Sequence, residues 1–319
     1  MRIILATRIA RVPVQRALEN ADGIELIVCE DLSEVAAKAA TADALVLSDP
    51  RGPDGRAIAE ALKTPGSRVR WVQILSAGAD GLLAHGVPAQ VIVTNQGGAV
   101  APAVAEHGMA MILGMARQIP AIAEQSARHV WNKEFTRPPF SVEGKVLTIV
   151  GLGNIGRQLA QRAAGFGMEL IGVSRSLASD PAVDRVLPLT DLHNALGQAD
   201  IVALCVASSA ETRHLMNDDA FNAMKPGTLF INLTRGETVD QIALQAALSS
   251  GHLAGAFIDV TDPEPLPADD PLWNAPNLII SPHIAGVGST RTGGRVANVV
   301  IENLRRFQAG EPLIHRLGG

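Results

Sequence analysis

The feature that most constrains this chain is a glycine-rich segment that directly follows a short apolar run. Residues 146–150 read Val-Leu-Thr-Ile-Val, and residues 151–156 read Gly-Leu-Gly-Asn-Ile-Gly. In such a pattern Gly151 permits a tight turn, Gly153 lets the backbone approach a phosphate, and Gly156 lets the next helix pack on its strand. Because the first N–H groups of that helix face the anion, the pattern predicts a site for the pyrophosphate of a dinucleotide. The residues expected to form it are Gly151, Gly153, Asn154, Ile155 and Gly156.

The next expected strand, residues 169–173, ends without an acidic residue. In a unit of this kind that position normally carries a carboxylate that binds the hydroxyls of the adenosine ribose. Here the chain reads Ser174, Arg175 and Ser176, which offer a guanidinium and two hydroxyls to a 2′-phosphate. We therefore expect NADP(H) to be preferred, with NAD(H) possible. The alternative is that Arg175 is a solvated charge at a strand end.

Composition narrows the class of protein. At 319 residues with 47% hydrophobic residues, the chain is long enough for two domains. A net charge of −5 and an aromatic content of 3% offer neither a basic field nor a stacking surface for nucleic acid. The apolar run at the N-terminus is too short for a signal peptide or a membrane span. Cys29 and Cys205 both lie in apolar runs, which indicates buried thiols and a reducing cytoplasm.

Apolar runs of strand length recur along the chain in two series, each with helical periodicity between the runs. The first series is 3–6, 24–28, 44–47, 69–75 and 91–94, and the second is 146–150, 170–173, 201–206, 228–233, 255–260 and 278–280. Each series brings its own helices, so the fold class is α/β with two doubly wound parallel-sheet domains. We expect residues 1–98 and 286–319 to form a substrate domain, and residues 99–285 a dinucleotide-binding Rossmann domain.

Two long helices are expected at the junctions between these domains. Residues 99–120 are rich in small residues and methionine, and a helix there would cross from one domain to the other. Residues 290–309 place Val296, Val299, Val300 and Leu304 on one stripe. This second helix is expected to return the chain to the first domain.

Three chemically capable side chains follow strands of the second series, where ligands bind in open α/β sheets. They are Arg235 in Asn-Leu-Thr-Arg, Glu264 in Asp-Pro-Glu-Pro-Leu-Pro, and His283 in Ser-Pro-His-Ile-Ala-Gly. Reduction of a 2-keto acid places negative charge on the carbonyl oxygen. A protonated His283 can donate the proton there while Arg235 offsets the charge. A carboxylate beside an imidazole favours its charged form.

In these motifs, their order and their spacing, the chain resembles the D-isomer-specific 2-hydroxyacid dehydrogenase family over nearly its whole length. The resemblance implies that Arg235 binds the substrate carboxylate and carbonyl, that His283 is the acid/base, and that Glu264 pairs with His283. It implies a flavodoxin-like substrate domain, a cleft between the domains and a homodimer. Asp259 would contact the nicotinamide end of the cofactor, and contacts to the cofactor are also expected from Val206, Thr234 and Gly286.

The first domain offers a possible substrate loop. Residues 75–80 end an expected strand in a glycine turn whose N–H groups could hold a carboxylate. The family resemblance also assigns this loop to the substrate, through Ser76, Ala77 and Gly78; the alternative is an ordinary β-turn. No cluster of histidines, cysteines and carboxylates has the spacing of metal ligands, so no metal is expected.

We therefore expect an NADPH-preferring reductase of small 2-keto acids such as glyoxylate or hydroxypyruvate, or the reverse oxidation of D-2-hydroxy acids. Phosphoglycerate, phosphite or a bulkier keto acid is the alternative substrate. Arg235, Glu264 and His283 would recognise only the carboxylate-and-carbonyl or oxyanion group that all these compounds share. A nucleotide-sensing corepressor scaffold is the alternative of another class. The chain lacks the extended tails that such a role favours.

Overall fold

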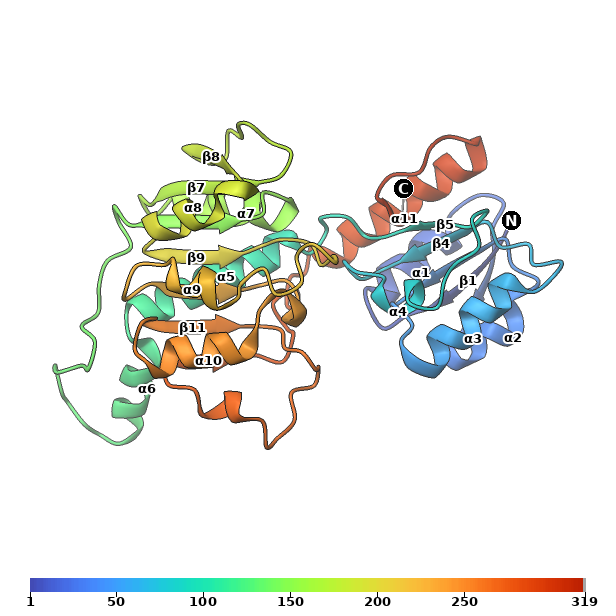
Figure 1. The fold of residues 1–319 in the computed structure, drawn as a ribbon. Coiled ribbons are helices and arrows are strands. Elements are labelled where there is room, and N and C mark those ends of the chain that lie inside the picture. Colours follow the sequence, from blue (N-terminus) through green and yellow to red (C-terminus); the bar gives the residue numbers. More distant parts are fainter. Residues whose placement is uncertain (318–319) are drawn as a thin grey trace. The chain divides into compact units, whose positions relative to one another are not determined.

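The computed structural model describes residues 1–317, and they form two compact units. The first comprises Met1–Val100 and the chain from Gly288 onward, and the second comprises Ala101–Val287. Each unit has its own sheet with helices on both faces (Figure 1). The prediction of two α/β domains is confirmed. Which unit binds substrate and which binds cofactor stays a prediction.

The sheet of the first unit has the strand order β13-β5-β4-β3-β1-β2, and all its neighbours are parallel except β13 and β5. Without β13 this is the flavodoxin-like order 2-1-3-4-5. The strands are β1 (Arg2–Ala6), β2 (Glu25–Val28), β3 (Ala44–Leu47), β4 (Trp71–Ile74), β5 (Ile92–Thr94) and β13 (Arg316–Leu317). The α-helices are α1 (Arg11–Glu19), α2 (Val35–Ala39), α3 (Gly52–Lys63), α4 (Asp80–Leu83) and α11 (Thr292–Ala309).

Alternation along the buried strands supplies both faces of this sheet. On β1, Ile3 and Leu5 face a core shared with α1 and α11, whereas Ile4 faces a core shared with α2 and α3. Because both faces are buried, the strand sequences are continuously apolar rather than alternating. The packing of α11 on α1 confirms that the C-terminal helix returns to the first unit.

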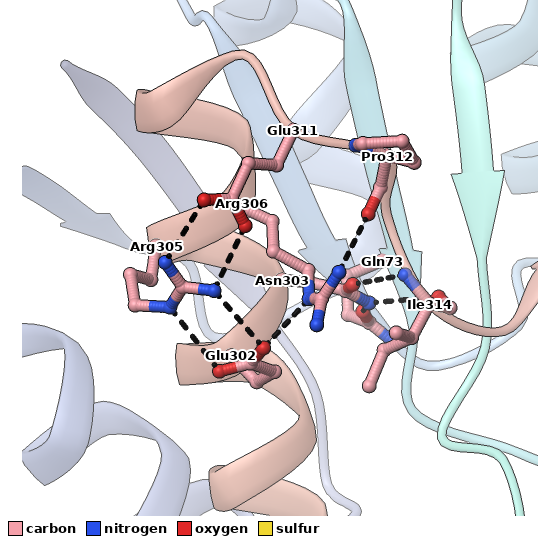
Figure 2. Close-up of polar contacts among 8 residues, drawn as sticks. All are labelled: Gln73, Glu302, Asn303, Arg305, Arg306, Glu311, Pro312 and Ile314. Atoms are coloured by element: carbon pink, nitrogen blue, oxygen red, sulfur yellow. Dashed lines mark hydrogen bonds and ion pairs between the residues drawn. The ribbon is translucent and has the colours of Figure 1, made fainter.

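A polar network around the buried side chains of Gln73 and Asn303 joins the C-terminal segment to the middle of this sheet (Figure 2). Asn303 of α11 donates to Gln73 Oε1 of β4, and its Oδ1 accepts the Ile314 N–H at 2.8 Å. Thr94 of β5 donates to the same Gln73 oxygen and accepts from the Trp71 indole. Since buried polar groups are costly unless they are paired, this network fixes the chain beyond α11 against β5.

The second unit has a sheet of seven strands in the order β12-β11-β10-β9-β6-β7-β8, with every pair parallel. Counted from β6, this is the Rossmann order with one further strand. The strands are β6 (Val146–Val150), β7 (Glu169–Ser174), β8 (Arg185–Pro188), β9 (Ile201–Leu204), β10 (Leu229–Asn232), β11 (Gly255–Ile258) and β12 (Leu278–Ile280). The α-helices are α5 (Ala101–Ala116), α6 (Ile119–Ala127), α7 (Asn154–Ala164), α8 (Leu192–Gln198), α9 (Asp218–Asn222) and α10 (Gln241–Ser249).

The helix expected to cross between domains lies entirely in the second unit, so that expectation is wrong. Helix α5 packs on α7 and β10, on the sheet face opposite α8, α9 and α10 (Figure 1). Its small residues serve this close packing. A Cβ on Gly108 would stand 2.5 Å from Leu233 Cδ1. No helix among residues 1–317 is long and apolar enough to span a bilayer.

Candidate active site

The glycine turn between β6 and α7 has the close packing that its sequence predicts. Gly151 has φ +104°, and a Cβ there would stand 2.6 Å from the Cys205 carbonyl oxygen. A Cβ on Gly156 would stand 2.1 Å from the Gly151 oxygen, so neither position accepts a side chain. Gly153 precedes α7, and in the described chain no atom beyond its neighbours lies within 4 Å of where its Cβ would be. This open backbone at a helix N-terminus fits a pyrophosphate.

The end of β7 carries the residues expected to select the cofactor. Ser174 Oγ accepts the N–H groups of Ser176 and Leu177, each at 3.3 Å, and so shapes the turn after the strand. The Arg175 guanidinium makes an ion pair with Glu211 of the loop after β9. Their side chains are 63% and 70% exposed, and such solvent-exposed pairs stabilise a protein by only about 0–1 kcal/mol. Arg175 can therefore be drawn from Glu211 by a phosphate.

The loop after β10 holds Arg235 through a buried asparagine. Asn232 Oδ1 accepts from the N–H and the hydroxyl of Thr234, and Asn232 Nδ2 donates to the Arg235 carbonyl at 3.0 Å. The next residue must be glycine, because a Cβ on Gly236 would stand 2.0 Å from the Thr261 carbonyl carbon. These contacts fix the backbone from which the Arg235 side chain extends.

Asp259, directly after β11, holds the loop that carries His283. Its carboxylate accepts the N–H groups of Ile284 and Ala285, both at 2.9 Å, and the Ser281 hydroxyl. The His283 N–H donates to the Asp259 carbonyl at 2.9 Å. These bonds hold His283 in the left-handed region at φ 53°, a conformation that is uncommon for a non-glycine residue.

His283 and Glu264 form a direct pair. The Nδ1 of the imidazole lies 2.7 Å from Oε1 of the carboxylate, and both side chains are partly exposed. A carboxylate on Nδ1 fixes the ring orientation, and the second ring nitrogen, Nε2, takes no part in this pair.

Arg235, Asp259 and His283 follow β10, β11 and β12, which are neighbours in one parallel sheet. Their carboxyl ends therefore meet at one edge, the edge that also carries the glycine turn after β6. Val206 and Thr234 follow β9 and β10 at this edge, and Gly286 lies in the loop beyond His283. A cation and a paired imidazole at the edge of a dinucleotide-type sheet suit proton and hydride transfer to a carbonyl.

The sequence pattern of the D-isomer specific 2-hydroxyacid dehydrogenases, in their NAD binding domain, matches residues 109–285. A glyoxylate reductase of Korarchaeum cryptofilum is 34% identical over 225 residues, which cover 69% of this chain and 67% of that protein. The chain belongs to the D-isomer specific 2-hydroxyacid dehydrogenase family.

Two solved structures of this family share its fold over almost the whole chain. The protein from Aeromonas salmonicida has a TM-score of 0.88 at 29% identity, and the match covers 99% of this chain and 98% of that chain. The protein from Xanthobacter autotrophicus, in complex with NADPH and MES, has a TM-score of 0.79 at 28% identity, with the same coverage.

The expected substrate loop of this family member lies after β4 in the first unit. Ser76 and Gly78 are partly buried and Ala77 is exposed. Asp49, after the neighbouring strand β3, accepts the N–H groups of Gly81 and Leu82 at 2.8 and 3.1 Å. Burial raises the pKa of this carboxyl group even though those two bonds favour its charged form.

Several residues that shape these loops were not singled out from the sequence. Asn232 is a buried polar residue at the end of an apolar strand, and such a position is itself a usable signal. Glu211 faces Arg175 from a loop 36 residues further along the chain, and nothing in the local pattern indicates that pairing. Within residues 1–317, no group of three or more histidines, cysteines and carboxylates could hold a metal ion.

The cavity of about 630 Å³ in the second unit is not this site. It is lined by residues such as Met115, Phe140, Gly255 and Leu278, at the amino ends of β10, β11 and β12. Arg235 and His283 follow the carboxyl ends of the same strands.

Proposed function

We propose that the protein reduces small 2-keto acids such as glyoxylate and hydroxypyruvate to D-2-hydroxy acids, with NADPH preferred over NADH. The observation that carries the proposal is the His283–Glu264 pair at the same sheet edge as Arg235 and the glycine turn. The name of the Korarchaeum relative and the NADPH in the Xanthobacter structure support it.

Different residues of the chain would bind the cofactor, bind the substrate and transfer the proton. The loop at Gly151–Gly156 and the N-terminus of α7 would hold the pyrophosphate, with Ser174, Arg175 and Ser176 around the 2′-phosphate. Bound reduced nicotinamide supplies a hydride to the substrate. Asp259 would position the nicotinamide end while its carboxylate holds the His283 loop.

Arg235 would bind the substrate carboxylate with two parallel N–H···O bonds and orient the adjacent carbonyl. His283 would donate the Nε2 proton to the carbonyl oxygen, and Glu264 on Nδ1 would balance the charge of the imidazolium. The backbone N–H groups of the Ser76–Gly78 loop in the first unit would bind the substrate carboxylate. The keto acid thus gains one hydride and one proton, and oxidation of the hydroxy acid reverses both transfers.

Steady-state turnover with NADPH and NADH over a panel of keto acids tests the proposal. We expect glyoxylate or hydroxypyruvate to give the highest kcat/KM, and NADPH to exceed NADH. A preference for phosphohydroxypyruvate or for a bulky keto acid would favour the alternative substrates, and activity on phosphite alone would do the same. Nucleotide binding without turnover of any of these compounds would favour a scaffold.

We also propose a homodimer and a cytoplasmic location, on the strength of family membership and of two free, buried cysteines. Light scattering after size exclusion should give twice the chain mass of 33.4 kDa. A mass equal to that of one chain would contradict the dimer.

A further inference from the structure

The loop proposed to bind the substrate is tied down by an asparagine that follows β5. Asn95 Nδ2 donates a short hydrogen bond to the carbonyl of Ala77, 18 residues earlier. Asn95 Oδ1 accepts the Gly97 N–H at 2.9 Å, so the same side chain also closes the turn after its own strand. One side chain therefore joins the ends of two neighbouring parallel strands, β4 and β5.

A second tie fixes the next carbonyl of the loop. Ser76 Oγ donates to the Gly78 carbonyl at 2.8 Å. In a trans peptide the C=O and the following N–H point in opposite directions. With the carbonyls of Ala77 and Gly78 both held, the N–H groups of Gly78 and Ala79 must point away from Asn95 and from the Ser76 hydroxyl.

Those N–H groups are the ones that an anion needs. Among residues 1–317, the N–H groups of Ala77, Gly78 and Ala79 donate no hydrogen bond. Successive backbone N–H groups in a turn form a concave site for an anion. The ties of Asn95 and Ser76 thus present donors that the protein itself does not use.

Asn95 is in turn held by the C-terminal segment. Its N–H donates to the His315 carbonyl at 3.0 Å, and β13 pairs with β5 immediately beyond. The His315 ring lies against Gly97, whose φ is +59° and where a Cβ would stand 2.5 Å from Nε2 of that ring. The buried network of Figure 2 anchors this segment on α11 and β4. The position of Asn95 is therefore fixed from both sides.

We infer that Asn95 is a positioning residue for substrate binding: by holding the Ala77 carbonyl it aims the Gly78 N–H at the substrate carboxylate, beside the Ala79 N–H that the Ser76 hydroxyl orients through the Gly78 carbonyl. The inference rests on the proposed function, since it assumes that this loop receives the keto acid. It predicts that replacing Asn95 weakens substrate binding more than it weakens cofactor binding.

Two variants separate the effect of the Asn95–Ala77 hydrogen bond from that of the Asn95–Gly97 hydrogen bond. Asn95→Ala removes both side-chain bonds, whereas Asn95→Ser keeps a hydroxyl that can accept the Gly97 N–H but is too short to reach Ala77. In both variants KM for glyoxylate should rise about tenfold or more, as expected when hydrogen bonds to a charged group are weakened. kcat should change less, and the Kd of NADPH, measured by fluorescence titration, should stay as in the wild type.

Thr94→Val is the matched control. It removes the buried bonds from Thr94, the last residue of β5, to Trp71 and Gln73 of β4 but changes no atom of the loop. Its Tm should fall, while KM for glyoxylate should rise far less than in Asn95→Ala. If KM rises equally in Thr94→Val, or stays normal in Asn95→Ser, the inference is wrong while the proposed function stands. A wild-type protein that turns over no keto acid would instead overturn the proposed function, and this inference with it.

Discussion

The imidazole Nδ1 of His283 lies 2.7 Å from the carboxylate Oε1 of Glu264, although the two residues are 19 positions apart. This contact joins the loop after β11 to the loop after β12. The Asp259 carboxylate accepts two backbone N–H groups of the His283 loop and so holds the backbone that carries the ring. In this pair the carboxylate occupies Nδ1 of the imidazole, and Nε2 takes no part in the contact.

Replacement of His283 should remove the proton donor and spare the cofactor site. We expect His283→Ala to lower kcat by a factor on the order of 10² to 10⁴, the usual contribution of a general acid. Its Kd for NADPH, measured by fluorescence titration, should stay near that of the wild type. Near-normal turnover in this variant would eliminate the assignment.

Glu264→Gln tests the partner of that imidazole. The glutamine oxygen can still accept from Nδ1, so the ring orientation survives while the negative charge is lost. kcat of Glu264→Gln should fall less than that of His283→Ala. kcat of Glu264→Leu, whose side chain offers no acceptor, should fall further than that of Glu264→Gln. Equal activity in all three Glu264 forms would show that the contact has no catalytic consequence.

Much of the architecture is readable from the sequence because its strands are buried on both faces. The runs at 44–47 and 146–150 are strands with those same bounds, since each is a buried, almost entirely apolar stretch that ends at a polar or turn-forming residue. The run at 278–280 is also a strand with the predicted bounds, although its three residues are only partly buried. The glycine turn is equally legible, because the backbone at Gly151 and Gly156 leaves no space for a Cβ. Local pattern suffices where burial and backbone geometry decide the structure.

Features that depend on distant partners could not be predicted. Strand β8 lies at a sheet edge with no fully buried residue, and β13 is only two residues long, so neither gives an apolar run. The small residues of α5 indicate close packing but not against which unit. The ties of Asn95 to Ala77 and of Arg175 to Glu211 span 18 and 36 residues. Side-chain pairs of this kind become visible only once the sheet order is known.

The contact between Arg175 and Glu211 should influence the preference for NADPH over NADH. Arg175→Ala should narrow the preference for NADPH over NADH about tenfold or more, because a charge-assisted bond to the 2′-phosphate contributes about 1.5–3 kcal/mol. Glu211→Gln should change the preference in the opposite direction, since it releases Arg175 and removes a like charge from beside the phosphate. The ratio of the two kcat/KM values measures both. A wild-type enzyme that prefers NADH would contradict the assignment.

Cys205 should be inert in the folded protein. It is buried, and burial raises the pKa of its thiol to about 12, so the reactive thiolate is scarce at pH 8. N-ethylmaleimide at that pH should leave Cys205 unmodified in the native protein and modify it in concentrated urea, as read by peptide mass spectrometry. Rapid native labelling would mean that the glycine turn, whose Gly151 packs against the Cys205 carbonyl, opens readily.

Asp200 should make the stability of the second unit depend on pH. Burial acts to raise the pKa of its carboxyl group, but hydrogen bonds from the Val146 N–H and the Lys225 ammonium, both at 2.9 Å, outweigh it and leave the pKa lowered. A carboxyl group with a lowered pKa in the folded state contributes stability above its unfolded pKa of about 3.9, and that contribution is lost as the pH falls through the folded value. The Tm of Asp200→Asn should lie below that of the wild type at pH 7, and the gap should shrink towards pH 3. A constant gap would contradict the proposed linkage.

Arg235 is expected to hold the substrate by its shape as well as its charge. The planar guanidinium can form two parallel bonds to a 2-keto carboxylate and still polarise the adjacent carbonyl, which the single ammonium of lysine cannot do. Arg235→Lys should therefore raise KM for glyoxylate and lower kcat together, because ground-state binding and stabilisation of the developing charge are both weakened. Arg185→Lys, the same change on the edge strand β8, is the control and should alter neither constant. If Arg235→Lys instead lost NADPH binding and kept its KM for the keto acid, Arg235 would belong to the cofactor site, and the anchoring of the carboxylate would have to come from other residues.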